Sequence, residues 1–192
     1  MTYNPKDRFF HKAKAEGFVA RSAYKLDELQ KKLKLISRGQ TVLDCGAAPG
    51  AWSQISSQIV GPQGRVIGLD LKVIELKIEN AAFYQMDVFQ FDPAILEGRQ
   101  LDCLLSDMAP NTTGVRSVDQ ARSAALCEEV LKLTQTHLKT HGNMVMKLFE
   151  GSDGEKIAKE TTKLFRATKR FKPEAVRKGS FETYIIGLDK KA

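Results

Sequence analysis

The lysine at position 147 interrupts an otherwise apolar run, residues 143–149, of the kind that forms a buried strand. A strand of a parallel sheet covered on both faces seldom carries a solvated lysine in its interior. The alternative is a lysine at the end or edge of the sheet whose ammonium group reaches outward to water. Burial and a neighbouring cation favour the neutral amine, which can accept a proton. We therefore interpret Lys147 as a candidate general base.

Three further charged residues occupy positions that local structure explains poorly. Asp107 follows the apolar run 101–106 and precedes Met-Ala-Pro, so an acid stands where a strand ends. Lys25 falls in the first turn of a helix that begins at Ser22, where a cation opposes the helix dipole; a frayed, solvated turn is the alternative. Glu182 begins the final apolar run and, alone, indicates only an edge charge. Each residue is weak evidence when taken singly.

A glycine turn, DCGAAPG at residues 44–50, separates a short β-prone run from a helical pattern. Strand, glycine turn and helix open the nucleotide-binding unit of many α/β folds. Gly46 and Gly50 permit a sharp turn and a close ligand because they lack a Cβ atom. The turn differs from the dinucleotide pattern GxGxxG, since its glycines are four apart and Asp44 precedes the first. A carboxylate here repels a pyrophosphate and attracts a cation, which favours S-adenosylmethionine (SAM) over NAD.

Acids stand at the ends of four predicted strands: Asp44, Asp70, Asp87 and Asp107. In an open α/β sheet, ligands bind beyond the carboxyl ends of the strands. Asp70 is placed to accept hydrogen bonds from ribose hydroxyls, and Asp87 from an adenine amino group. Aspartate is also a common turn residue, but four of them beside the glycine turn favour a cofactor site. Trp52 either walls that cofactor or packs beneath the first helix of the unit.

Strand-like and helix-like segments alternate after a basic, partly helical stretch at residues 1–20. The predicted strands are residues 41–45, 65–70, 82–86, 101–106, 142–149, 164–171 and 182–188. The predicted helices are residues 22–38, 51–60, 117–140 and 153–163, with weaker ones near 73–79 and 93–97, and turns are predicted at 61–64 and 141–143. This alternation predicts a Rossmann-like α/β fold, mostly parallel, with helices on both faces. The short break before the last strand permits a hairpin, so that strand can be antiparallel. We expect one domain over residues 1–192, with residues 1–40 as a basic arm and helix.

The net charge of +7 is carried by the two ends of the 192-residue chain. Residues 1–40 contain 10 Lys/Arg and 4 Asp/Glu, and residues 163–192 contain 9 and 3. The segment between them contains 11 Lys/Arg and 16 Asp/Glu. Solvated surface lysines explain most basic runs, but basic ends around an acidic cofactor domain favour contact with a polyanion, most commonly a nucleic acid.

Composition argues against several other classes of protein. No apolar run approaches the ~20 residues of a membrane span, and the N-terminus lacks the apolar region of a signal peptide. Cys45, Cys103 and Cys127 show no CxxC spacing, so we expect reduced, buried thiols, no metal site and a cytoplasmic protein. Nothing suggests a coiled coil or an exposed apolar helix, and we expect a monomer.

Along nearly its whole length the chain resembles the FtsJ-type (RlmE-like) ribose 2′-O-methyltransferases. The resemblance rests on residues 21–28, 44–54, 106–111, 145–149 and 182–184. It implies a seven-stranded SAM-methyltransferase fold with the last strand antiparallel. It assigns the family's Lys-Asp-Lys-Glu tetrad to Lys25, Asp107, Lys147 and Glu182. It assigns SAM contacts to Gly50, Trp52, Asp70, Asp87 and Asp107. The family usually has a second glycine before the tryptophan; Ala51 replaces it here and still permits a helix start.

The resemblance also implies a substrate and a mechanism. Bacterial members methylate a uridine ribose of large-subunit ribosomal RNA, whereas eukaryotic relatives act on transfer RNA, mitochondrial ribosomal RNA or mRNA caps. The short chain without a transit peptide favours ribosomal RNA or a large-subunit particle. Lys147 would deprotonate the 2′-hydroxyl, Asp107 would orient Lys147, and Glu182 would steer the lysines or the ribose. Lys25 would either keep Lys147 neutral or hold the target phosphate.

Three alternatives remain open from the sequence. A nicotinamide-dependent oxidoreductase would use a similar sheet, although the GxGxxG pattern is missing. A non-catalytic RNA-binding assembly factor would not need the tetrad. A methyltransferase for proteins or small molecules would not need the two basic ends.

Overall fold

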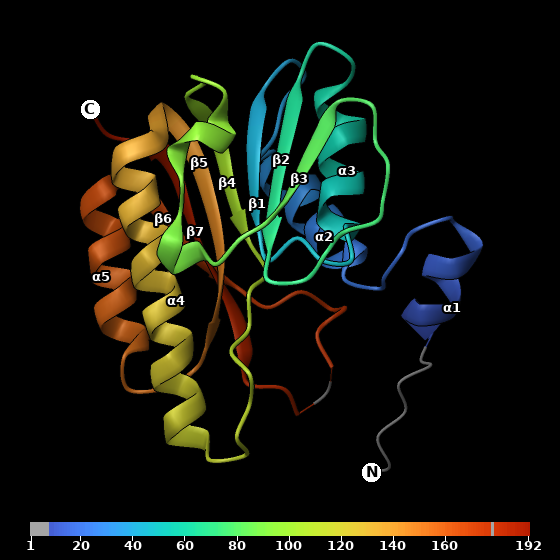
Figure 1. The fold of residues 1–192 in the computed structure, drawn as a ribbon. Coiled ribbons are helices and arrows are strands. Elements are labelled where there is room, and N and C mark those ends of the chain that lie inside the picture. Colours follow the sequence, from blue (N-terminus) through green and yellow to red (C-terminus); the bar gives the residue numbers. More distant parts are fainter. Residues whose placement is uncertain (1–7, 178) are drawn as a thin grey trace.

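A seven-stranded sheet organises the protein; the structure is a computed structural model that describes residues 8–177 and 179–192 (Figure 1). The strands are β1 (Thr41–Cys45), β2 (Arg65–Asp70), β3 (Ala81–Gln85), β4 (Leu101–Ser106), β5 (Leu138–Phe149), β6 (Phe165–Phe171) and β7 (Glu182–Lys190). The α-helices are α1 (Arg8–Ala15), α2 (Ala23–Leu33), α3 (Ala51–Val60), α4 (Arg116–His137) and α5 (Gly154–Leu164). Two 3₁₀-helices, η1 (Val88–Gln90) and η2 (Pro93–Leu96), follow β3.

The central strand of the nucleotide-binding half is β1, which pairs in parallel with β2 on one side and β4 on the other. All of β1 is buried, as its apolar sequence predicts. The chain moves outward from β1 to β2 and β3 and then returns to β4, giving the order β3-β2-β1-β4-β5-β7-β6. The order therefore reverses between β1 and β4. In an open α/β sheet, ligands bind at such a switch point, beyond the carboxyl ends of the strands.

The last strand, β7, runs antiparallel between β5 and β6, while the other strands run parallel to one another. This confirms the predicted mostly parallel sheet with an antiparallel last strand. The register places Lys147 of β5 opposite Tyr184 of β7. Paired residues project from the same face of a sheet, so this pairing brings the two side chains together.

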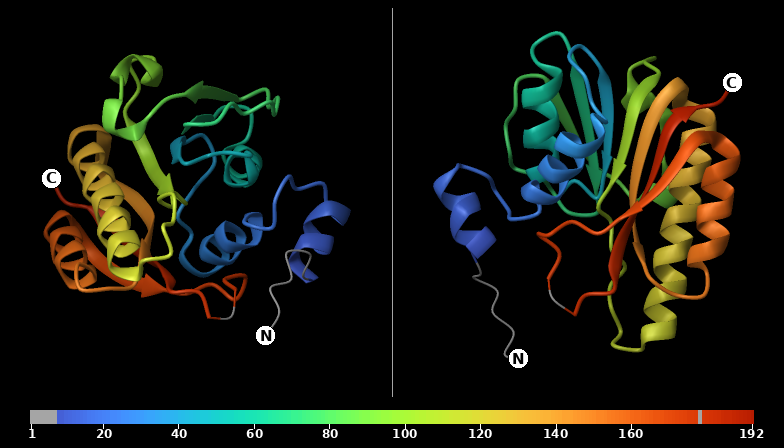
Figure 2. Two further views of the ribbon diagram at one scale, coloured as in Figure 1. Left: turned by 60° about the horizontal axis from the view of Figure 1, so that its bottom comes forward. Right: turned by 180° about the vertical axis from the view of Figure 1, so that it is seen from behind.

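Two apolar layers join the sheet to its helices (Figure 2). On one face α4 and α5 pack through residues such as Val130 and Ile157. On the other face α2 and α3 pack through residues such as Leu26 and Ile55. Helices therefore cover both faces, as predicted, and the carboxyl ends of the strands are left for ligands.

The predicted helix near residues 73–79 does not form; this segment is irregular. Ile74 and Leu76 both lie against Gly50 at the start of α3. Residues two apart share a face in extended chain and not in a helix, so this packing overrides the weak helical pattern. The weaker helix predicted near 93–97 is present as η2.

The boundary between α4 and β5 also differs from the prediction. The helix ends at His137, and β5 begins at once with Leu138. The predicted turn at residues 141–143 lies inside β5 as an irregularity, where His141 has a φ of 68° and the register with β4 shifts. A bulge absorbs the turn residues without ending the strand.

The basic N-terminal segment and the loop between β6 and β7, a part of the basic C-terminal end, meet beside α2. The predicted helix at 22–38 ends at Leu33, because Lys34 adopts the left-handed conformation, and no side-chain bond from Ser22 caps it. Helix α1 packs through Ala13 onto Tyr24 of α2 and Ala175 of the loop before β7. The predicted arm is thus partly helical, although its residues 1–7 lie outside the described residues.

The cysteines at positions 45, 103 and 127 are free and buried, as predicted. Within residues 8–177 and 179–192, no helix combines the length and the apolar character needed to cross a bilayer.

Candidate active site

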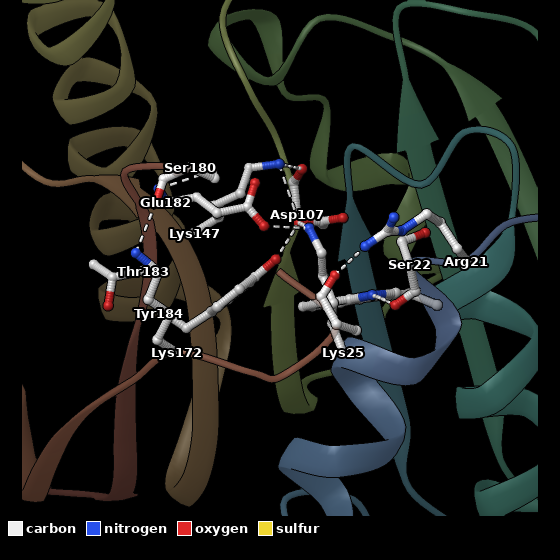
Figure 3. A network of polar contacts seen from close by, with 12 residues as sticks. Arg21, Ser22, Lys25, Asp107, Lys147, Lys172, Ser180, Glu182, Thr183 and Tyr184 are labelled. Atoms are coloured by element: carbon white, nitrogen blue, oxygen red, sulfur yellow. Dashed lines mark hydrogen bonds and ion pairs between the residues drawn. The ribbon is translucent and has the colours of Figure 1, made fainter. Parts of the chain in front are cut away.

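Two lysines and two carboxylates meet near the carboxyl ends of β4 and β5 (Figure 3). Lys147 Nζ lies 3.0 Å from Asp107 Oδ1 and also donates to the Asp107 carbonyl oxygen. Lys25 Nζ lies 2.5 Å from Glu182 Oε1 and 3.9 Å from Asp107 Oδ1. The structure therefore brings together the four residues of the tetrad, although 157 positions separate Lys25 from Glu182.

Different elements supply the four groups. Lys25 lies in the first turn of α2, and Lys147 lies near the carboxyl end of β5. Asp107 directly follows β4, and Glu182 is the first residue of β7. Strand pairing and the packing of α2 on the sheet thus fix the cluster, so its members need not be close in sequence.

The cluster is largely withdrawn from water and balanced in charge. Lys25 is 9% exposed and Lys147 is 8% exposed. An isolated ammonium group in such surroundings is costly, and pairing with carboxylates compensates for the lost hydration. Burial by itself raises the pKa of Asp107, but the charges of Lys147 and Lys25 and a hydrogen bond from Tyr184 outweigh it and lower that pKa. Asp107 is therefore a carboxylate at neutral pH.

Tyr184 is a member of the cluster that the sequence did not indicate. Its hydroxyl donates to Asp107 Oδ1 at 2.6 Å, and its ring is fully buried. Burial, followed by the charges of Asp107 and Glu182, raises the pKa of Tyr184 well above its usual value. The hydroxyl therefore keeps its proton and holds Asp107 in position. Its place opposite Lys147 in the β5–β7 register is the signal that could have revealed it.

A cavity of about 590 Å³ opens at the switch point of the sheet, beside the cluster. Its lining includes four of the predicted cofactor residues, Gly46, Asp70, Asp87 and Asp107. Three others, Asp44, Gly50 and Trp52, lie outside that lining. Asp107 belongs to both the cavity and the lysine cluster. A ligand in the cavity and a nucleophile at Lys147 would therefore meet at this residue.

Asp70 fixes the glycine turn to the end of β2. One of its carboxylate oxygens accepts from the Ala48 backbone N–H at 2.9 Å, and the other accepts from that of Lys72 at 2.9 Å. Each oxygen keeps a further lone pair for a ligand. Asp87 also lines the cavity and accepts from the Phe89 backbone N–H at 3.0 Å, so it begins η1.

Two glycines of the turn have different structural tasks. Gly46 has a φ of 78°, and a Cβ atom there would lie 2.6 Å from Cγ of Met108. The end of β1 therefore touches the chain that follows β4, and any side chain at Gly46 would displace Met108, which lines the cavity. Gly50 has a φ of 112°, and its missing Cβ leaves room for Leu76. Gly50 thus supports the turn from outside the cavity.

Asp44 lies beneath the turn and is fully buried. Ser53 Oγ donates to its Oδ2 at 2.6 Å, while its Oδ1 has no hydrogen-bond partner among the described residues. Burial raises the pKa of Asp44 to about 7, assisted by the negative charges of Asp107 and Asp70 and opposed by Ser53. A cation near the turn would favour its charged form.

Trp52 packs in the interior. It is 2% exposed, its Nε1 donates to the Ser22 carbonyl at 2.9 Å, and its ring lies 5.8 Å from that of Tyr184. Of the two interpretations that the sequence left open, the structure shows the packing one. Through these contacts Trp52 ties α3 to α2, which carries Lys25.

The site fits a cationic ligand that contains a nucleoside. Three carboxylates at the ends of successive strands outnumber the two cations of the cavity lining, Lys72 and Arg122, and give the rim a net acidic character. None of the described lining residues supplies a glycine-rich pyrophosphate cradle. Asp70 and Asp87 offer acceptors for hydroxyl and amino groups, and the unpaired oxygen of Asp44 adds negative potential below. These are the features that SAM requires.

Two proteins similar to this one over nearly the whole chain are named as methyltransferases. The chain is 44% identical over 196 residues to ribosomal RNA large subunit methyltransferase E of Bdellovibrio bacteriovorus, covering all of both chains. It is 48% identical over 189 residues to the protein of that name from Desulfatibacillum aliphaticivorans, covering 97% of this chain and 91% of the other.

Solved structures share the fold. A ribosomal RNA methyltransferase from Plasmodium falciparum superposes with a TM-score of 0.80 at 23% identity, covering 90% of this chain and 98% of that one. Fibrillarin of Aeropyrum pernix, solved with bound SAM, superposes with a TM-score of 0.61 at 19% identity, covering 87% and 76%. Residues 18–190 match the FtsJ-like methyltransferase family. Together with the close relatives, this match establishes that the chain belongs to the FtsJ-like methyltransferases.

Proposed function

We propose that this protein transfers the methyl group of SAM to the 2′-hydroxyl of a ribose in RNA, and that the target is a uridine of large-subunit ribosomal RNA in the cytoplasm. The observation that carries the proposal is the position of Lys147. Its amine is buried and bonded to Asp107, and Asp107 also lines the cavity. Asp107 thus belongs both to the surroundings of the candidate base, Lys147, and to the cofactor cavity.

The cavity residues would bind the cofactor. Asp70 would accept from the ribose hydroxyls, Asp87 from the adenine amino group, and the backbone at Gly46 would lie against the ligand. When bound, SAM supplies an electrophilic methyl group on a positively charged sulfur. The carboxylate of Asp107 would favour that positive charge at the cavity's inner end.

Lys147 would remove the proton of the 2′-hydroxyl. Its nitrogen makes two hydrogen bonds, to Asp107 Oδ1 and to the Asp107 carbonyl. A neutral amine keeps two N–H donors for these bonds, and its lone pair is then free to accept the substrate proton. Asp107 therefore orients the base, because the two occupied directions fix the third.

Lys25 would weaken the attraction of the Asp107 carboxylate for a protonated Lys147, which favours the neutral form of Lys147. Its ammonium group lies 3.9 Å from Asp107 Oδ1 and competes for that negative charge. Glu182 holds Lys25 at 2.5 Å, so the second lysine does not move away. This arrangement supports an electrostatic role for Lys25 rather than the phosphate-holding role.

The charge distribution supports an RNA substrate. The basic N-terminal segment meets the loop between β6 and β7, a part of the basic C-terminal end, where Arg21 donates to the Ala175 carbonyl. The relatives from Bdellovibrio and Desulfatibacillum are named for ribosomal RNA of the large subunit. An oxidoreductase is disfavoured by the acidic cavity rim, and a non-catalytic RNA-binding factor would have no use for a buried lysine pair.

Transfer of labelled methyl tests the proposal. The protein, labelled SAM and large ribosomal subunits from cells lacking this gene should yield label in ribosomal RNA, at a nucleotide that resists alkaline cleavage because its 2′-oxygen is methylated. Label on a base or in protein would refute the ribose assignment. Label in transfer RNA alone would refute the ribosomal one.

A further inference from the structure

An aromatic pair with a stacked arginine adjoins the tetrad. The rings of Phe149 and Phe181 lie 4.7 Å apart between centroids, edge to face at 72°. The guanidinium carbon of Arg116 lies 5.4 Å from the centroid of Phe181. The three residues come from the end of β5, the chain just before β7 and the start of α4. None of them has a task in the mechanism above.

The sheet holds these three residues at a fixed place beside Lys147, the candidate general base. Phe149 lies opposite Glu182 in the β5–β7 register, and the Glu150 backbone N–H donates to the Phe181 carbonyl at 2.8 Å. Phe149 is two residues beyond Lys147 in the same strand, roughly 7 Å along it. A nucleotide whose ribose reaches Lys147 can therefore reach the aromatic pair with its base.

The outer members of the group are open to a ligand. Phe149 is buried, whereas Phe181 is half-buried and Arg116 is exposed. Arg116 is the first residue of α4, where a cation opposes the helix dipole. No carboxylate pairs with it among residues 8–177 and 179–192. Helix stability therefore does not account for an arginine here, but its contact with Phe181 does.

We propose that Phe181 and Arg116 stack the base of the nucleotide whose ribose faces Lys147, so that the enzyme selects an unpaired nucleotide. This rests on the proposed function. Proteins recognise unpaired RNA by stacking its bases on aromatic rings and on the guanidinium planes of arginines. A base held at Phe181 is removed from its own stack, which exposes the 2′-hydroxyl to Lys147. Phe149 supports the ring of Phe181 from behind.

Binding measured without catalysis tests the stacking. The wild-type protein should bind a short oligouridylate more tightly than an abasic ribose-phosphate oligomer of equal length. Phe181→Leu should lose roughly ten-fold in affinity for the oligouridylate, in the range expected for one stacked base, and should bind the abasic oligomer unchanged. Phe181→Trp should keep the preference. Equal losses on both oligomers, or no loss on either, would overturn the proposal.

Kinetics on large-subunit RNA provide the second test. Phe181→Leu and Arg116→Ala should raise KM for RNA, with SAM affinity unchanged. Phe91→Leu and Arg99→Ala are the matched controls, because Phe91 packs on His137 and Arg99 pairs with Glu97. Methyl transfer with the same KM in Phe181→Leu and Phe91→Leu would overturn the stacking while leaving the proposed function intact. Absence of ribose methylation by the wild type would instead refute the proposed function.

Discussion

At the scale of single residues, Lys147 carries the heaviest chemical task. Lys147→Ala removes the amine that accepts the 2′-hydroxyl proton, and we expect methyl transfer to fall at least about 100-fold, as for loss of a general base. SAM affinity should stay near that of the wild type, because Lys147 does not line the cavity. Single-turnover transfer and equilibrium binding of SAM measure the two quantities.

The same strand offers a control for this substitution. Lys139 lies near the other end of β5, where its side chain is 42% exposed and pairs with Asp102. Lys139→Ala removes the same side-chain atoms and should leave transfer unchanged. Turnover by Lys147→Ala at the level of Lys139→Ala would rule out a lysine base.

Asp44 should make the protein's stability depend on pH. Its pKa is raised by burial to about 7 in the folded state, whereas an unfolded aspartate titrates near ~3.9. Between these values the folded protein holds a proton that the unfolded chain has lost, so the free energy of unfolding decreases as pH rises. The contribution is fully present below about pH 4 and is lost above about pH 7, and amounts to on the order of 4 kcal/mol.

Asp44→Asn should remove this dependence, because an amide does not titrate. Denaturant unfolding at about pH 5 and about pH 8 should show a steeper loss for the wild type than for the variant. Ser53→Ala deletes the hydrogen bond that opposes the rise in pKa and should extend the wild-type loss to higher pH. Parallel profiles for wild type and Asp44→Asn would contradict the burial argument.

At this scale the sequence indicated several of the residues that belong to the site, but not the contacts that they make. Lys147 could be found because a charge in an apolar strand is locally anomalous, and the acids could be found because each follows a strand. Tyr184 could not, because a tyrosine in a buried strand is ordinary and only the register reveals its bond to Asp107. The position of Trp52 depended on how α3 packs against α2, which no local pattern encodes.

At the scale of elements, the contact between β1 and the chain after β4 shapes the cavity. Gly46→Ala places a methyl group 2.6 Å from Cγ of Met108 and keeps a residue at a φ of 78°. The strained backbone alone costs roughly 1–2 kcal/mol. We expect a larger loss of unfolding free energy than that, together with weaker SAM binding.

Gly98→Ala separates the cost of the strained backbone from the cost of the clash with Met108. Gly98 also has a positive φ, 72°, but a Cβ atom there would meet nothing within 4 Å. Its substitution should show the backbone cost alone and leave SAM binding unchanged. If the two alanine variants lost equal stability and bound SAM equally well, the close approach at Gly46 would have no part in forming the site.

Element boundaries show where local pattern gives way to tertiary structure. The buried strands and α3 were predictable because their apolar spacing matches their burial. Residues 73–79 were not, since packing of Ile74 and Leu76 on Gly50 outweighs a weak helical pattern. The turn at 141–143 was identified from its residues, but a bulge within β5 uses the same backbone freedom.

At the scale of the whole molecule, folding brings the basic N-terminal segment against a part of the basic C-terminal one, the loop between β6 and β7. Contacts of α1 with Tyr24 and Ala175 place α1 and this loop beside α2, next to the tetrad that α2 helps to form. Each phosphate neutralised by such a surface releases counterions, so the logarithm of the RNA affinity should fall linearly with the logarithm of salt concentration. Each lost contact with single-stranded RNA should lower that slope by roughly 0.7.

Charge reversal at two exposed lysines should locate the RNA. Lys14 lies on α1, in the basic surface beside α2, whereas Lys132 lies on α4, in the acidic middle segment of the chain, and pairs with Glu129. Lys14→Glu should weaken binding of large-subunit RNA and flatten its salt dependence, because one phosphate contact becomes a repulsion. Lys132→Glu changes the net charge equally and should alter neither quantity. Equal effects of the two variants would show that net charge attracts the RNA, and a salt-independent affinity in the wild type would exclude the basic ends from binding it.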